Sequence, residues 1–225
     1  MKTLCLAAMV VVLVIGTAHA QTPAAHTGYP ADVSADSGFR LPLPKREDLD
    51  PSAQKTFDQL NSPSGGSLAG LHGPGGILLY SPKLSELNSP LNRFLRSEEA
   101  GFGPHVRELA ILVTAREFNS QFEWAAHENE AIKAGVAPHT IDIVKHHRST
   151  RGIPEADANI IQLGREMFRD KKVKSATYAR TLKQFGPRGL INLVGLMGNY
   201  AGTAALLTTF DIQLNPGQKP LLPMP

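Results

Sequence analysis

Cysteine is almost absent from this sequence. The only cysteine, Cys5, lies within the first twenty positions, which have the features of a removable export signal, as described below. Without them the chain contains no thiol. Disulfides, thiolate nucleophiles, iron–sulfur ligation and the reactive thiol of a peroxidase all need that missing sulfur. The rest of the chain is long enough to be stabilised by a hydrophobic core alone.

An excess of charge of one sign is also missing, and aromatic residues are few. Lys and Arg total 23 against 20 Asp and Glu, the formal net charge is +3, and aromatic residues make up 6% of the 225 positions. No run of basic residues alternates with aromatic residues to follow a phosphate backbone, which argues against a nucleic-acid partner. The length and the 42% hydrophobic content are ordinary for one globular domain.

The N-terminal segment 1–20 has the pattern of a Sec-type signal peptide. Lys2 supplies the positive charge, an apolar stretch follows through Ile15, and Ala18-His19-Ala20 is a small-x-small cleavage site. The apolar stretch is shorter than the ~20 residues that span a bilayer, so we expect no stable membrane anchor. The sequence therefore predicts cleavage after Ala20 and a periplasmic or secreted protein.

The remainder is predicted to be all-α. No alternating apolar–polar stretch bounded by hairpin turns is present, whereas apolar residues recur at three- and four-residue spacing. We expect a flexible leader over 21–45, a helical domain over 46–215 and a Pro-rich tail over 216–225. We predict helices over 51–61, 82–97, 121–134 and 187–210. Further helices are predicted to begin at 104, 138, 154 and 175, and the last of these ends before Gly186. A glycine-rich loop is predicted over 62–76.

Three side chains make the strongest chemical pattern. Glu123 and His127 are four residues apart, on one face of one helix, with apolar or small neighbours. Glu108 lies near the start of the preceding helix, and antiparallel packing of the two helices would bring it close to His127. A carboxylate beside an imidazole in an apolar environment is a proton-transfer pair, in which the carboxylate orients the imidazole.

Two other interpretations of these residues stay open. Glu123 and His127 match an ordinary pair of surface side chains four residues apart on a helix. Such a pair stabilises the helix by about a few tenths of a kcal/mol. Alternatively, they bind a metal together with His146 or His147, although the surrounding basic residues oppose a divalent cation. We predict no metal and no organic cofactor. His72, in the glycine-rich loop, is a candidate for lining a pocket.

A family resemblance rests on several short segments, among which the E-W-A-A-H block is fairly specific. The sequence resembles the carboxymuconolactone decarboxylase-like family, which shares its all-helical fold with the alkylhydroperoxidase D proteins, over roughly residues 67–212. The segments that carry it are Arg107-Glu108-Leu109-Ala110-Ile111-Leu112, Glu123-Trp124-Ala125-Ala126-His127, Ala134-Gly135-Val136, Gly152-Ile153-Pro154 and Gly198-Asn199-Tyr200.

The resemblance separates two branches by chemistry. In the alkylhydroperoxidase D branch a C-x-x-C pair lies between a glutamate and a histidine, matched here by Glu108 and His127. Ser120 and Glu123 occupy the cysteine positions, so thiol peroxidase chemistry is excluded. The decarboxylase branch has an E-x-x-x-H pair, matched by Glu123 and His127, and acts on a carboxylated lactone. This chain departs from that branch in its export signal, its leader and its Pro-rich tail.

The resemblance therefore implies a cofactor-free lyase or isomerase that assembles as a homotrimer or homohexamer and acts on a small molecule. His127 is the expected general acid/base, Glu123 its orienting carboxylate or a second acid/base, and Glu108 the end of the relay. Arg107 and Arg116 are the cations near the motif for a substrate carboxylate or enolate. A non-catalytic ligand-binding or scaffold protein of the same fold, and a metal-dependent oxidoreductase, are the alternatives.

Overall fold

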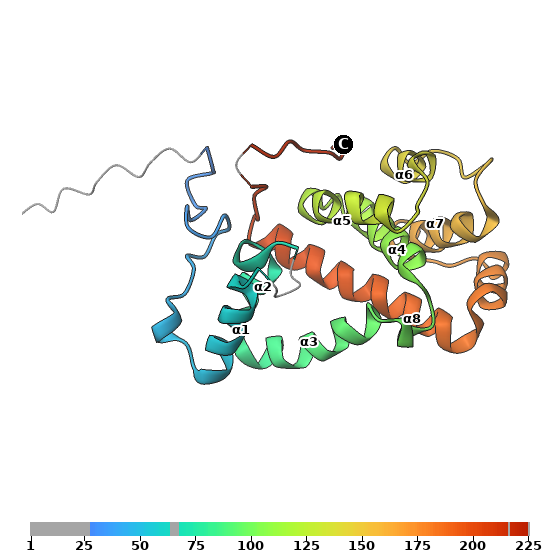
Figure 1. The fold of residues 1–225 in the computed structure, drawn as a ribbon. Coiled ribbons are helices and arrows are strands. Elements are labelled where there is room, and N and C mark those ends of the chain that lie inside the picture. Colours follow the sequence, from blue (N-terminus) through green and yellow to red (C-terminus); the bar gives the residue numbers. More distant parts are fainter. Residues whose placement is uncertain (1–27, 64–67, 216, 225) are drawn as a thin grey trace, which may run out of the picture.

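The computed structural model describes residues 28–63, 68–215 and 217–224 (Figure 1), so the predicted signal peptide lies outside the described residues. Within these ranges the regular structure is helical, without a strand, which confirms the all-α prediction. The α-helices are α1 (Pro51–Asn61), α2 (Pro74–Leu78), α3 (Pro82–Leu95), α4 (Pro104–Glu117), α5 (Gln121–Lys133), α6 (Pro138–Lys145), α7 (Glu155–Phe168) and α8 (Ser175–Thr209).

Proline and short polar residues set the helix starts. α1, α2, α3, α4 and α6 each begin with a proline, whose missing N–H costs nothing in the first turn. At α1 the Asp50 side chain also accepts hydrogen bonds from the N–H groups of Ser52 and Ala53, both at 2.9 Å. Pro154 differs from its predicted place inside α7: it is the residue that precedes the helix.

The main core surrounds α4. All nine residues from Glu108 to Arg116 are buried, because α4 packs against α5, α6, α7 and α8. Gly164 of α7 allows a close approach to α4 and α8, since a side chain there would overlap Val113 and Met197. Between Glu108 and Arg116, a polar residue on α4 is therefore buried whichever side of the helix it occupies.

The long helix α8 runs across the molecule and links its two ends (Figure 1). It is bent at Gly186, whose φ of 66° and ψ of 174° are non-helical, so its two parts match the two helices expected on either side of this residue. By length and composition α8 is also long and apolar enough to cross a membrane, a property that core helices of soluble proteins share. It contacts α2, α3, α4 and α7.

A smaller core joins the beginning of the described chain to α2, α5 and α8. It contains Phe39, Ile77, Phe122 and Leu207, and Phe39 is completely buried. The described part of the expected leader, 28–45, thus lies packed against the helices. The expected glycine-rich loop also contains regular structure, a short 3-10 helix (Gly70–His72) and the start of α2.

The helix α3 turns three of its leucines outward, whereas Leu95 at its end is buried. Leu84, Leu87 and Leu91 are 49%, 62% and 49% exposed, although their spacing is typical of a core-facing stripe. The opposite side of α3, which carries Ser85, Asn88 and other polar residues, lines a cavity instead.

Candidate active site

The helices α4 and α5 bring the three predicted acid/base residues close together. They are joined by a short turn at Asn119, which has a φ of 52°, and Ser120, and they pack against each other. The Nδ1 atom of His127 on α5 lies 2.7 Å from Oε2 of Glu108 on α4. Both side chains are buried, at 6% and 2% exposure.

Arg107 is the second side chain that binds the carboxylate of Glu108. Its Nε donates to Oε1 of Glu108 at 2.9 Å, and its Nη1 donates to the backbone carbonyl of Arg96 at 2.8 Å. Burial alone would raise the pKa of Glu108, but the hydrogen bonds and charges of His127 and Arg107 outweigh it and lower this pKa below its usual value. Glu108 is therefore an anion at neutral pH.

An ionised Glu108 determines which nitrogen of His127 is available. A carboxylate only accepts hydrogen bonds, so the Nδ1 of His127 donates to it. In the neutral imidazole the remaining nitrogen, Nε2, is then the one that can accept a proton. The sequence left open whether Glu123 orients His127, and the observed geometry gives this contact to Glu108.

Glu123 is in a different electrostatic environment. Its side chain is 3% exposed, and neither carboxyl oxygen has a hydrogen-bond partner among the described residues. This burial raises the pKa of Glu123 to about 8, with Ser120 partly opposing the rise. At neutral pH Glu123 is thus a protonated acid one helical turn from His127, whereas Glu108 is an anion. Two carboxyl groups in opposite protonation states are the usual arrangement for acid/base catalysis.

Tyr200 of α8 covers the imidazole. Its ring meets that of His127 edge to face, with the centroids 5.3 Å apart. Burial raises the pKa of Tyr200, and the charges of Arg96, Glu108, Glu123 and Arg107 all act on it. The phenol thus stays neutral and lies within electrostatic reach of the other site residues.

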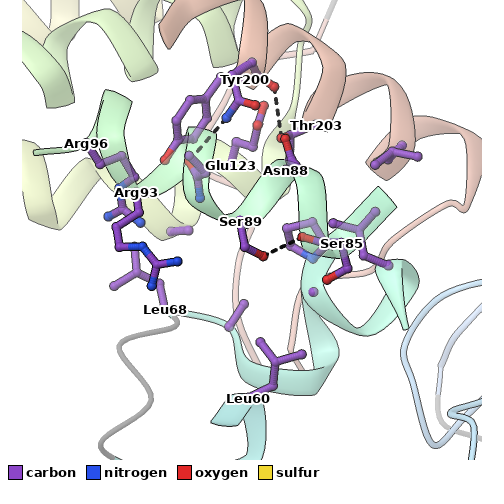
Figure 2. Close-up of a pocket in the computed structure, with 18 of the residues that line it drawn as sticks. Leu60, Leu68, Ser85, Asn88, Ser89, Arg93, Arg96, Glu123, Tyr200 and Thr203 are labelled. Atoms are coloured by element: carbon purple, nitrogen blue, oxygen red, sulfur yellow. Dashed lines mark hydrogen bonds between the residues drawn. The ribbon is translucent and has the colours of Figure 1, made fainter. Parts of the chain in front are cut away.

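These groups line one end of a cavity of about 680 Å³. Glu123, His127, Tyr200 and Arg107 all contribute to its wall. Figure 2 shows Glu123, Tyr200 and Arg96 gathered at one end, and Leu60 of α1 at the opposite end. The wall formed by α3 is polar, because Ser85, Asn88, Ser89, Asn92, Arg93 and Arg96 all face the cavity.

Two of the residues expected to bind substrate lie elsewhere. Arg116 is near the end of α4, where its guanidinium donates to Oδ1 of Asn119 and to the carbonyl of Pro223 in the tail. The Nδ1 of His72 lies 3.1 Å from the carbonyl oxygen of Ser37 in the leader. Neither side chain lines the cavity, whereas Arg107 does.

The alternative metal site is not assembled in the described part of the chain. His146 lies 3.4 Å from Asp142, and His147 lies 3.4 Å from Glu117 at the end of α4. Three or more His, Cys, Asp or Glu side chains do not converge anywhere among the described residues. His146 and His147 are therefore in contacts of their own and do not join Glu123.

Sequence reasoning missed Arg93, Arg96 and Tyr200. Arg93 and Arg96 continue a polar stripe that begins at Ser85 and runs between the leucines of α3. This polar stripe was the signal in the sequence that could have identified Arg93 and Arg96. Helical periodicity alone, however, does not show which face of a helix points inward. Tyr200 was recognised only as part of the Gly198-Asn199-Tyr200 segment.

Comparison with known proteins adds no family assignment. No protein-family model matches the chain, and no curated protein sequence matches it.

Proposed function

We propose that this chain is an exported, carboxymuconolactone decarboxylase-like enzyme with an alkylhydroperoxidase D-like helical bundle, which catalyses cofactor-free proton transfer on a small carboxylated or lactone substrate. The observation that carries the proposal is the buried imidazole of His127, which Glu108 orients and which lines one cavity together with the buried carboxyl group of Glu123. The lowered pKa of Glu108 and the raised pKa of Glu123 separate a base from an acid at one pH.

The roles follow from the contacts. Glu108 accepts the Nδ1 hydrogen of His127 and stabilises the imidazolium that forms when Nε2 takes a proton. Glu123, protonated at neutral pH, is the acid that returns a proton. Arg107 neutralises Glu108 and lies at the cavity wall, where its charge favours a developing enolate.

Both reaction types proceed through the same enolate. In an isomerisation, His127 removes a proton from the carbon next to the substrate carbonyl, and Glu123 protonates a different carbon of the resulting enolate. His127 then gives up its extra proton to solvent and Glu123 regains one, which restores the starting state. In a decarboxylation, the bond between the substrate and its carboxylate carbon breaks, carbon dioxide leaves, and the electron pair of that bond forms the enolate. One proton from Glu123 or from a protonated His127 replaces the lost group and is resupplied by solvent, so no oxidant or reductant is needed.

The proposal also covers export and assembly. Export follows from the signal-like segment 1–20. A homotrimer or homohexamer is supported by the outward leucines of α3, since an exposed apolar stripe on one helix face commonly marks a protein interface.

Replacement of His127 tests the chemistry. Purified protein is incubated in D2O with a series of five-membered lactones that carry a carboxylate, and NMR records deuterium uptake and carbon dioxide loss. We expect His127→Ala to lower the rate on any accepted lactone by about 10²–10⁴-fold, the usual contribution of a positioned acid/base.

The matched control is His139→Ala, because His139 is an exposed histidine on α6. It should retain the wild-type rate. Full activity in His127→Ala, or equal loss in both variants, would remove the proposed role of His127.

A further inference from the structure

The cavity extends well beyond its acid/base end, and the positive charge in its wall is not balanced by negative charge. We infer that it takes an amphiphilic organic acid, whose carboxylate is held by Arg96 and whose apolar body extends between α1, α2 and α8. The inference rests on the proposed function for the site itself, and it names the substrate class and the residue that selects it.

Arg96 has an unmet hydrogen-bonding need. Its Nε is buried and has no hydrogen-bond partner among the described residues. Its backbone carbonyl accepts from Arg107, which holds the end of α3 against α4 beside Glu108. A buried guanidinium N–H without a partner is costly, and a carboxylate is the group whose geometry best satisfies it.

The local charges also favour an anion. Arg107 is neutralised by Glu108, whereas neither Arg93 nor Arg96 forms an ion pair within the described residues. Glu123 is protonated at neutral pH and adds no compensating charge. The acid/base end of the cavity therefore carries a positive charge that a substrate anion would balance.

Apolar residues also line the cavity away from Arg96. They are Leu60 of α1, Leu78 of α2, and Leu206 and Leu207 of α8, with the polar Thr56 and Gln59 of α1 among them. Figure 2 shows Leu60 well separated from Arg96 and Tyr200. A volume of about 680 Å³ lies within the range of roughly 300–1,000 Å³ that is typical of sites for drug-sized ligands. A compact lactone would leave this end filled with water, whereas an apolar body would displace that water.

Three probe ligands separate charge from size in a calorimetric titration of the full chain. They are 4-phenylbutyrate, its neutral amide 4-phenylbutyramide, and butyrate, which lacks the ring. We expect 4-phenylbutyrate to bind at least ~10-fold more tightly than either of the others, because only it has both the charge and the apolar body.

Arg96→Gln then tests the residue. We expect it to weaken 4-phenylbutyrate by about 10–100-fold, the value of a charged hydrogen bond, and to leave 4-phenylbutyramide unchanged, which a general structural defect would not do. Arg151→Gln, at an exposed position outside the cavity, is the matched control and should bind like the wild type.

Other outcomes overturn the inference. Equal affinity for 4-phenylbutyrate and 4-phenylbutyramide would contradict the anion site. Equal affinity for 4-phenylbutyrate and butyrate would contradict the apolar subsite, and the absence of binding by all three probes would contradict both. If Arg96→Gln does not fold, the acid–amide comparison on the wild type still decides. The test is separate from catalysis: Arg96-dependent binding of 4-phenylbutyrate by a wild-type protein that turns over none of the lactones contradicts the proposed function alone.

Discussion

Burying a carboxyl group without a hydrogen-bond partner is costly, and Glu123 is such a group. It lies on the same helix as His127, on the face that meets the cavity. Stability alone would favour an apolar residue at this position. A protonated acid beside an oriented imidazole is the function that explains its presence.

The cost of Glu123 depends on pH in a defined direction. Its pKa is about 8 in the folded protein, against an ordinary value of 4.5. The folded state thus keeps a proton that the unfolded chain releases between these values, and stability falls as pH rises through this window. We expect Glu123→Gln to become more stable relative to the wild type, by about 1–3 kcal/mol, between pH 5 and pH 8.

Urea denaturation at several pH values measures this difference. Glu99→Gln replaces an exposed glutamate, and its difference from the wild type should stay constant with pH. A Glu123→Gln difference that also stays constant would mean that Glu123 is ionised in the folded protein.

Local spacing predicted part of this site. The E-x-x-x-H spacing correctly placed Glu123 and His127 on one helix. The expected antiparallel packing of two consecutive helices correctly predicted that Glu108 lies close to His127. Which carboxylate touches the imidazole depends on the register between α4 and α5, and spacing along one helix does not contain that information. For the same reason Arg116, close in sequence, does not line the cavity, whereas Arg96, the residue after α3, does.

At the scale of elements, proline and glycine positions were the most informative signals. Prolines correctly marked the starts of α1, α3, α4 and α6, whereas Pro74, which begins α2, lay in the expected glycine-rich loop. Gly135, with a φ of 85°, follows the end of α5 as predicted. The helix α3 shows the limit of periodicity. Its leucine spacing predicted the helix correctly, but its polar face turns toward the cavity and its leucines toward the surface.

The outward leucines of α3 lead to a prediction about assembly. If they pack against another copy of the chain, a charge at Leu87 is buried without a partner and the assembly dissociates. We expect the wild type to have the mass of a trimer or hexamer by light scattering, and Leu87→Glu to have the mass of a monomer.

Ile132→Glu is the control, since Ile132 is 49% exposed on α5 and lies outside the leucine stripe of α3. It should retain the wild-type mass. A wild type that is monomeric at micromolar concentration contradicts the proposed assembly.

At the scale of the whole molecule, segments far apart in the sequence build the cavity. α1, α2 and α3 close one side, α5 contributes the acid/base residues, and the C-terminal half of α8 contributes Tyr200 and the apolar wall (Figure 1). Composition predicted one domain and the spacing of apolar residues predicted helices, but neither contains information on long-range packing of this kind.

The chain ends are also part of the fold. Phe39 of the leader is buried against Ile77 and Leu207. In the tail, Leu222 is buried, and its backbone N–H and carbonyl both bond to Gln121 at the start of α5. Their Pro-rich composition gave no sign of this packing, because single apolar anchors do not produce a periodic pattern.

The proposed chemistry requires a protonated Glu123 and an oriented His127 in one cavity, and an NMR titration measures the protonation of Glu123. In protein labelled with ¹³C at the glutamate side-chain carboxyl, the resonance that Glu123→Gln removes identifies this group. We expect this resonance to titrate with a midpoint near the pKa of about 8 that results from its burial. A midpoint near the ordinary carboxyl value of 4.5 would show that Glu123 is not the protonated acid.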